Sequence, residues 1–159
     1  MGEGILLYGI RTGMGKAAER IAVVLADIRR QGFSSVSPFS VGSVEKRMKE
    51  YAARNGITLG GGQIYMSYNS IAHSMRDAKK AKGLAVSERD LMSFPKSRRK
   101  MELYYDGRGF VYTNRKTKYI IHPNYKIKTR NGKTKKVMFL TAGVVTDPKE
   151  FELPKYKKI

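Results

Sequence analysis

Apolar side chains in the first part of the chain recur with the period of a helix. Four of them have the spacing i, i+3, i+4, i+7, namely Ile21, Val24, Leu25 and Ile28. This spacing predicts an amphipathic helix near Lys16–Gln31 that ends at Gly32. The following segment, Phe33–Gly42, is rich in Ser, Pro and Gly and is predicted to be a linker.

Two further helices are predicted in the first half of the chain. The first follows Ser43 and ends at Gly56, and its apolar residues again have helical spacing. The second begins after Ser67 or Asn69, both of which are good N-cap residues, and ends at Gly83.

A short helix is predicted near the centre of the chain. Ser87 and Asp90 have the spacing of a capping box, in which both side chains bond to the backbone of the first turn. Pro95 is expected to terminate this helix, because the residue before a proline is disfavoured in helical conformation.

From residue 101 onward the apolar positions alternate with a period of two, as they do in strands. A glycine-containing turn at Asp106–Gly109 and the dipeptide Asn131–Gly132 indicate hairpins. The predicted strands are Met101–Tyr105, Phe110–Thr113, Lys118–His122, Tyr125–Thr129 and Lys135–Ala142. The sequence therefore predicts an α+β fold, in which N-terminal helices are followed by a four- or five-stranded antiparallel meander.

The same pattern suggests a division of the chain into three parts. We expect an N-terminal helical appendage in residues 1–35, a helix and linker in 36–62, and an α+β domain in 63–159. As a hypothesis, the first sixty residues are the remainder of a longer delivery polypeptide.

The chain is strongly basic. Its 159 residues include 32 Lys and Arg but only 13 Asp and Glu, which gives a formal net charge of +19. Residues 1–35 hold five bases and three acids, so nearly all of the excess lies in the rest of the chain. Such an excess favours a polyanionic partner, and nucleic acid is the first to consider.

Other classes of function are disfavoured by composition. The chain has no Cys, which excludes disulfides, a thiol nucleophile and Cys-ligated metal sites. Its two histidines make a His-rich metal site improbable, so we expect neither a metal nor another cofactor. No window reaches the roughly 18 apolar residues of a transmembrane helix, and no membrane partner is expected.

Aromatic residues are interleaved with the bases. Between Lys96 and Lys136 there are fourteen bases and two acids, together with six Tyr or Phe. This mixture suits phosphate neutralisation combined with stacking of bases, although alternating aromatics can equally form the core face of a strand. The candidates for contact with nucleic acid are Arg76, Lys80, Arg98, Arg99, Tyr112, Arg115, Lys126 and Lys128.

Four residues are candidates for chemistry. His73 lies on the polar face of its predicted helix, near Arg76 and Lys80, where nearby cations favour the neutral imidazole that a general base needs. A solvated surface histidine is the alternative reading. By alternation, His122 shares a strand face with Lys118. Thr141 on the last strand is either part of a site or ordinary strand filling.

Six segments, taken together, resemble one family of nucleases. They are Ile71–Arg76, Val86–Leu91, Phe94–Pro95, Lys118–Ile121, Val137–Ala142 and Asp147–Phe151. Their layout resembles the barnase–EndoU–colicin–RelE-like ribonuclease superfamily, in particular its phage-borne and polymorphic-toxin members. That family places a His-bearing helix and a second helix before an antiparallel sheet. The likeness covers residues 63–159.

The resemblance implies metal-independent cleavage of RNA, in which the ribose 2′-OH attacks the adjacent phosphate. His73 matches the family's helix histidine and would be base or acid. Lys118 matches its strand cation, which stabilises the phosphorane, and Thr141 matches its last-strand hydroxyl. His122 has no secure counterpart. The chain lacks the carboxylate base of barnase itself.

The expected partner is thus transfer, ribosomal or messenger RNA, with an acidic immunity or antitoxin protein if the domain is a toxin. The expected location is the cytoplasm of the producing or target cell, after delivery with a phage particle or secretion system in the second case. The alternative is a basic nucleic-acid-binding protein without catalysis, associated with a phage or with ribosomes.

Overall fold

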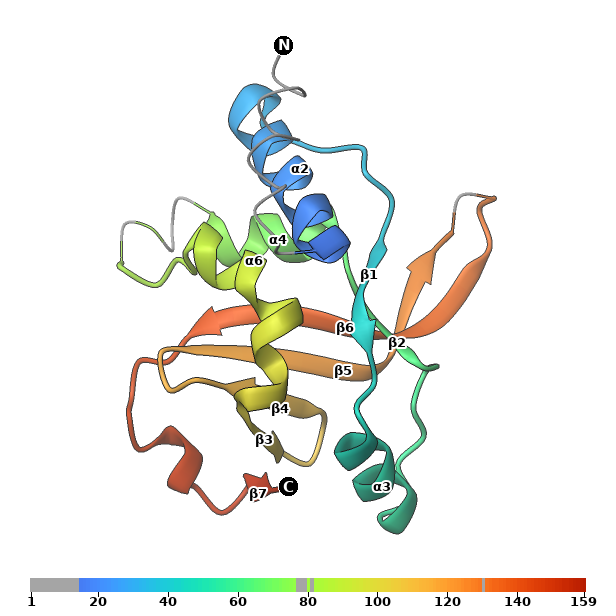
Figure 1. The fold of residues 1–159 in the computed structure, drawn as a ribbon, viewed down its shortest axis with the longest axis vertical. Helices are drawn as coiled ribbons and strands as arrows, with labels where there is room; N and C mark the ends of the chain where they lie inside the picture. The colour runs from blue at the N-terminus through green and yellow to red at the C-terminus, as the bar shows by residue number, and fades with distance from the viewer. Residues whose placement is uncertain (1–14, 77–79, 81, 130) are drawn as a thin grey trace.

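Seven strands form one mixed sheet at the centre of the molecule (Figure 1). The computed structural model describes residues 15–76, 80, 82–129 and 131–159. The strands run in the order β1-β2-β6-β5-β4-β3-β7. Their bounds are β1 Phe39–Ser43, β2 Gln63–Met66, β3 Glu102–Tyr105, β4 Phe110–Thr113, β5 Thr117–Lys128, β6 Thr134–Val144 and β7 Lys157–Lys158.

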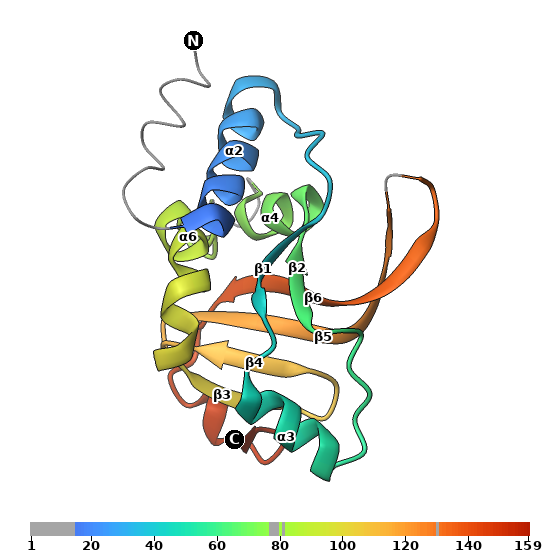
Figure 2. The same ribbon diagram turned by 45° about the vertical axis from the view of Figure 1, so that its right-hand side comes forward.

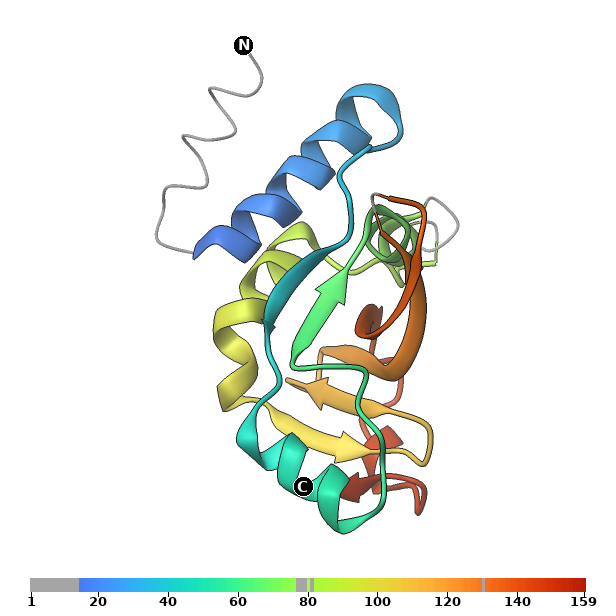
Figure 3. The ribbon, with the colours of Figure 1, turned by 90° about the vertical axis from the view of Figure 1, so that its right-hand side faces the viewer.

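Helices pack beside this sheet. They are α2 Gly15–Gln31, α3 Lys46–Arg54, α4 Tyr68–Met75 and α6 Glu88–Ser97, followed by the 3₁₀ turns η1 Arg98–Lys100 and η2 Glu150–Glu152. Helix α2 contacts α6, α4 and β1, and Figure 3 shows α2 and α6 together on one side of the sheet. Helix α3 lies at the opposite end of the molecule from α2 (Figure 2).

The α+β class predicted from sequence is confirmed, but the meander is not. The sheet is larger than expected, and β2 pairs in parallel with β6 while the other neighbouring strands are antiparallel. The helices also do not all precede the strands, because β1 and β2 are interleaved with α2, α3 and α4. Both strands are short, so a periodicity of two is hard to recognise in them.

The segment predicted to be a linker, Phe33–Gly42, contains most of strand β1. Phe39 and Val41 are 4% and 1% exposed, and they belong to the same hydrophobic core as Ile21 of α2 and Phe94 of α6. Residues from all three of the expected parts of the chain therefore belong to one hydrophobic core.

Strand β5 continues through the Pro123–Asn124 pair that was expected to separate two strands. The register with β6 shifts between His122 and Tyr125, which is the signature of a bulge. Pro has no N–H to donate to the hydrogen-bond ladder of the sheet, so a proline is tolerated in a strand at a bulge. Beyond the bulge, β5 and β6 extend as a long hairpin that projects from the rest of the sheet (Figure 2).

The helix caps follow the sequence prediction in part. Ser67 is the N-cap of α4 and forms a capping box with Ser70. The Ser87 hydroxyl accepts the backbone N–H of Asp90, but the Asp90 carboxylate accepts a hydrogen bond from Thr117 on β5 instead of completing the box. Pro95 does not end its helix, which continues to residue 97.

Candidate active site

A cavity of about 560 Å³ opens between α4 and the β5–β6 hairpin. His73 borders it from α4, Thr141 and Phe139 border it from β6, and Lys126 and Lys128 border it from β5. The remaining lining residues are Pro38, Ser67, Asn69, Ser70, Tyr125 and Ile127. No lining residue is acidic, so the cavity favours an anionic ligand.

His122 reaches the edge of this cavity through Thr141. The Nε2 atom of His122 and the Oγ1 atom of Thr141 are hydrogen-bonded at 3.2 Å. The ladder places His122 opposite Phe139 and Ile120 opposite Thr141, so that the imidazole and the hydroxyl share one face of the sheet. Of the four residues singled out for chemistry, His73 and Thr141 thus border one cavity, and His122 is linked to it by its hydrogen bond with Thr141.

The environment of His122 favours the neutral imidazole. Burial lowers the pKa of His122 below its ordinary value of 6.5, although the nearby carboxylate of Asp106 acts in the opposite direction. Asp106 is itself held in place, because it accepts the backbone N–H groups of Arg108 and Gly109. At neutral pH the ring nitrogen without a proton is available as a base.

Two stacked aromatic rings, those of Tyr125 and Phe139, lie next to His122. The ring of Tyr125 stacks on Phe139 at 4.4 Å with an interplanar angle of 13°, and it lies 6.1 Å from the ring of His122. Tyr125 is 46% exposed, which is unusual for a large aromatic side chain in this molecule. A nucleobase can stack on the Tyr125 ring without any rearrangement of the core.

Comparison of the chain with protein-family models, with curated proteins and with solved structures finds no match. The resemblance to the barnase–EndoU–colicin–RelE-like superfamily accordingly stays a prediction. Two structural findings accompany it. None of the described helices is long and apolar enough to span a membrane. In the described part of the chain, no three His, Asp or Glu side chains are grouped so that they could hold a metal ion.

Lys118 lies away from the cavity. It precedes His122 by four residues on β5, or roughly 13 Å along the strand. Its ammonium group donates to both carboxylate oxygens of Glu150, at 3.0 and 2.8 Å, and so ties η2 to the sheet. Burial would raise the pKa of Glu150, but hydrogen bonds from Lys118 and Tyr156 hold it below its ordinary value. Lys126 and Lys128 are instead the cations at the cavity.

We expect Lys118→Met to act on stability and not on chemistry. The change leaves the partly buried Glu150 carboxylate with Tyr156 as its remaining partner, which should cost about 1–3 kcal/mol in the free energy of unfolding. Chemical denaturation measures this loss. A variant as stable as the wild type would contradict this structural role of Lys118.

Two candidates for contact with nucleic acid are buried. Arg98 is 3% exposed, and its guanidinium donates to the backbone carbonyls of Ser43 and Pro95. Tyr112 is 0% exposed, and its hydroxyl donates to Glu45. The prediction that these two side chains contact RNA is wrong, because neither can be reached from solvent in the folded chain.

Four further candidates lie outside the cavity, whereas Lys126 and Lys128 line it. Arg76 and Lys80 line a smaller pocket with α2, and Arg99 is exposed on η1. Arg115 is engaged with Glu102, to which its Nε and Nη2 atoms donate at 2.6 and 3.1 Å. None of these four cations borders the space that His73 and Thr141 share.

Several lining residues were missed by sequence reasoning. Pro38 belongs to the segment expected to be a linker, Ser67 and Asn69 were considered only as helix-capping residues, and Ser70 was not singled out. Their proximity to the hairpin depends on the parallel pairing of β2 with β6, for which the sequence carries no readable signal.

Proposed function

We propose that this protein is a metal-independent endoribonuclease. The observation that carries the proposal is the hydrogen-bonded pair His122–Thr141 at the edge of a cation-lined cavity that His73 also borders. Two imidazoles, a hydroxyl and two ammonium groups are the parts that cleavage by the ribose 2′-OH requires.

In the proposed reaction, His122 is the general base. Its lowered pKa keeps the ring neutral, and with its proton on Nδ1 the Nε2 atom accepts a hydrogen bond from Thr141. The ribose 2′-OH replaces that hydroxyl as the donor and gives its proton to Nε2. The 2′-oxygen then bonds to phosphorus, the P–O5′ bond breaks, and His73 protonates the departing 5′-oxygen.

The surroundings supply charge and orientation. Lys126 and Lys128 neutralise the phosphorane, and Thr141 donates to one of its non-bridging oxygens once it has been released from His122. Tyr125 holds a neighbouring base by stacking. The products are a 2′,3′-cyclic phosphate and a 5′-hydroxyl, so no water or metal-bound hydroxide enters this step.

A substrate lacking one hydroxyl tests this mechanism. An RNA oligonucleotide is first mapped for its cleavage position, and the same oligonucleotide is then made with a single 2′-deoxyribose 5′ to that bond. We expect cleavage at the altered position to disappear while other positions are still cut. Cleavage that persists at the deoxy position would exclude attack by the 2′-oxygen and thus the proposed reaction.

The pH profile of kcat/KM should report the pKa of His122. Because the base works in its neutral form, the rate falls as the pH falls through that pKa, and burial places the midpoint of this acid limb below 6.5. Asp106→Asn removes a charge that raises the pKa, while the side-chain oxygen can still accept from the turn. We expect this variant to shift the limb to still lower pH. An acid limb above 6.5 would contradict the assignment.

A non-catalytic nucleic-acid-binding protein is the second candidate. The exposed Tyr125 ring and the cationic lining favour it, since both serve binding without any chemistry. The two functions differ in their dependence on His122. A binding protein retains its affinity and has no cleavage to lose when the imidazole is removed.

A further inference from the structure

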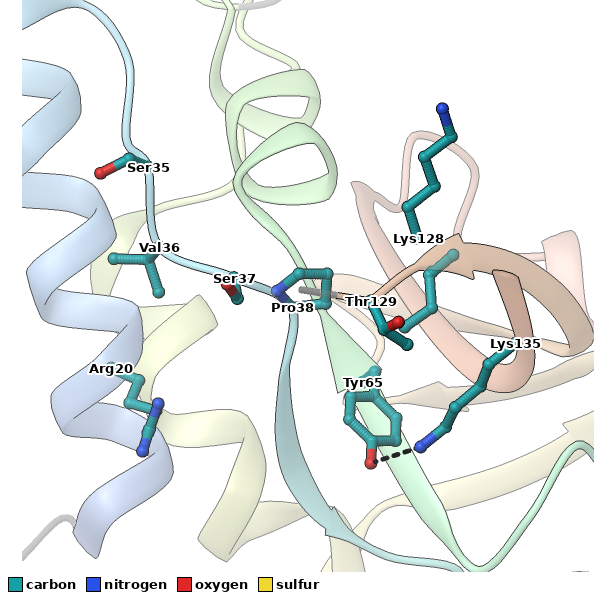
Figure 4. A pocket seen from close by; sticks show the side chains of 10 residues that line it. Arg20, Ser35, Val36, Ser37, Pro38, Tyr65, Lys128, Thr129 and Lys135 are labelled. Atoms are coloured by element: carbon teal, nitrogen blue, oxygen red, sulfur yellow. Dashed lines mark hydrogen bonds between the residues drawn. The ribbon is translucent and has the colours of Figure 1, made fainter. Parts of the chain in front are cut away.

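A second cavity lies between the α2–β1 connection and the end of the β5–β6 hairpin. Its volume is about 540 Å³, and residues from α2, from the connection, from β2 and from both hairpin strands line it. Figure 4 shows Tyr65 at its centre, with Arg20 of α2 on one side and Lys128 and Lys135 of the hairpin on the other. The remaining lining residues are Ser35, Val36, Ser37, Pro38, Ile127 and Thr129.

Tyr65 and Lys135 contact each other in this cavity and offer a ligand an aromatic ring beside a positive charge. The Lys135 ammonium lies 5.1 Å from the centre of the Tyr65 ring and 3.5 Å from its hydroxyl oxygen, toward which it points in Figure 4. The ring is partly exposed, whereas the strand neighbours Ile64 and Met66 are 0% exposed and belong to the core. Tyr65 is therefore an aromatic side chain presented to a cavity and not a core residue.

The two cavities are neighbours. Pro38, Ile127 and Lys128 line both of them. Tyr65 of β2 pairs with Phe139 of β6, on whose ring Tyr125 of β5 stacks, so the two tyrosines come from strands on either side of β6. Strands two positions apart in a sheet are separated by roughly 10 Å, a gap that one nucleic-acid strand can bridge.

Charge and chemistry select the ligand of the second cavity. Its lining includes three cations, Arg20, Lys128 and Lys135, and no acid. The hydroxyls of Ser35 and Ser37 can donate to phosphate or sugar oxygens. Cations around an aromatic ring, with polar groups at the rim, match a nucleotide whose base stacks while its phosphate is neutralised.

We propose that this second cavity binds another nucleotide of the same RNA strand, outside the scissile bond, with its base stacked on Tyr65. The inference rests on the proposed function for the identity of the ligand. It adds that the substrate is single-stranded where it crosses β6, because the bases of a duplex are stacked on one another and cannot lie on a protein ring. Lys128 lines both cavities and so lies where the strand passes from one cavity to the other.

Binding of an RNA that cannot be cleaved tests this proposal separately from catalysis. The probe is a fluorescent 2′-O-methyl 12-mer without secondary structure, measured by anisotropy at low salt against the same sequence as a duplex. We expect Tyr65→Ala to weaken binding of the single strand roughly 5- to 150-fold, the range for loss of one stacked base. Tyr65→Phe keeps the ring and should bind within about twofold of the wild type.

A further pair of variants separates the contact that Lys135 makes in the cavity from the effect of the protein's overall positive charge. Lys135→Ala should weaken binding and reduce the salt dependence by about one phosphate contact, with a change in the log–log slope of roughly 0.7. Lys49→Ala removes the same charge from the exposed face of α3, far from the cavity, and should change the affinity much less.

Each outcome decides a different question. Equal affinity of wild type and Tyr65→Ala for the single strand overturns the proposal, as does a duplex whose binding depends equally on Tyr65. Loss of affinity in Tyr65→Ala, rescued by Tyr65→Phe, supports it even if the wild type proves unable to cleave RNA. In that case the catalytic proposal fails while the strand path remains.

Discussion

Replacing His122 with alanine should lower the rate of RNA cleavage by about 10²- to 10⁴-fold, the usual contribution of a general base. The loss should appear in kcat, because the imidazole acts on the 2′-OH in the transition state and contributes little to binding of the ground state. The measurement is single-turnover cleavage of a labelled oligonucleotide with enzyme in excess. His73→Ala should cause a loss in the same range, since protonation of the 5′-oxygen is the partner step.

Two controls give this result its meaning. Circular dichroism establishes that each variant is folded, and anisotropy with the 2′-O-methyl probe establishes that RNA is still bound. The double variant should be less impaired than the product of the two single losses, because residues that act as a unit are not additive. Near wild-type cleavage by His122→Ala would remove the histidine from the mechanism.

Replacing Phe94 with alanine should have the largest effect on stability. Phe94 is 0% exposed on α6, and its ring packs at 4.6 Å from the ring of Tyr119 and at 5.6 Å from that of Tyr112. Truncation leaves a cavity where the helix meets β4 and β5, at a cost of about 3–5 kcal/mol in the free energy of unfolding. For a chain of this length, the midpoint of thermal unfolding should fall by roughly 6–20 °C.

The matched control is another phenylalanine of the same chain. Phe33 follows α2 and is 53% exposed, so Phe33→Ala should change the free energy of unfolding by less than about 0.5 kcal/mol. Thermal unfolding of both variants, followed by circular dichroism, makes the comparison. Equal stability of the two variants would mean that α6 does not pack on the sheet as described.

Local features of the fold were predictable because they depend on nearby residues. The helical spacing of Ile21, Val24 and Leu25 marks α2, and all three residues are buried as that spacing requires. Ser67 and Ser87 cap the helices that follow them. Gly132 is the second residue of the predicted Asn131–Gly132 turn and adopts a φ of +79° at the end of the hairpin.

The arrangement of the strands was not predictable in the same way. The parallel pairing of β2 with β6 joins segments about seventy residues apart, and it is decided by packing rather than by local pattern. The bulge at Pro123 also escapes a reading by alternation, because it shifts the register of every later residue of β5 relative to β6.

In the candidate site, too, local features were predictable from the sequence and long-range contacts were not. Alternation placed Lys118 and His122 on one face of a strand, which is correct, but their partners differ: Glu150 for the lysine and Thr141 for the histidine. Tyr112 and Tyr125 occur in the same basic stretch, yet one is 0% and the other 46% exposed. Composition alone does not tell a buried core tyrosine from an exposed one on which a nucleobase can stack.

The most direct test is cleavage of RNA by the purified protein in the presence of EDTA. Wild-type protein and His122→Ala are incubated with total RNA and with a defined oligonucleotide, and the products are resolved on a denaturing gel. We predict discrete fragments with 2′,3′-cyclic phosphate ends from the wild type and intact RNA from the variant. RNA that remains intact with the wild type, yet is retarded on a native gel at low salt, would contradict the account and leave a nucleic-acid-binding protein.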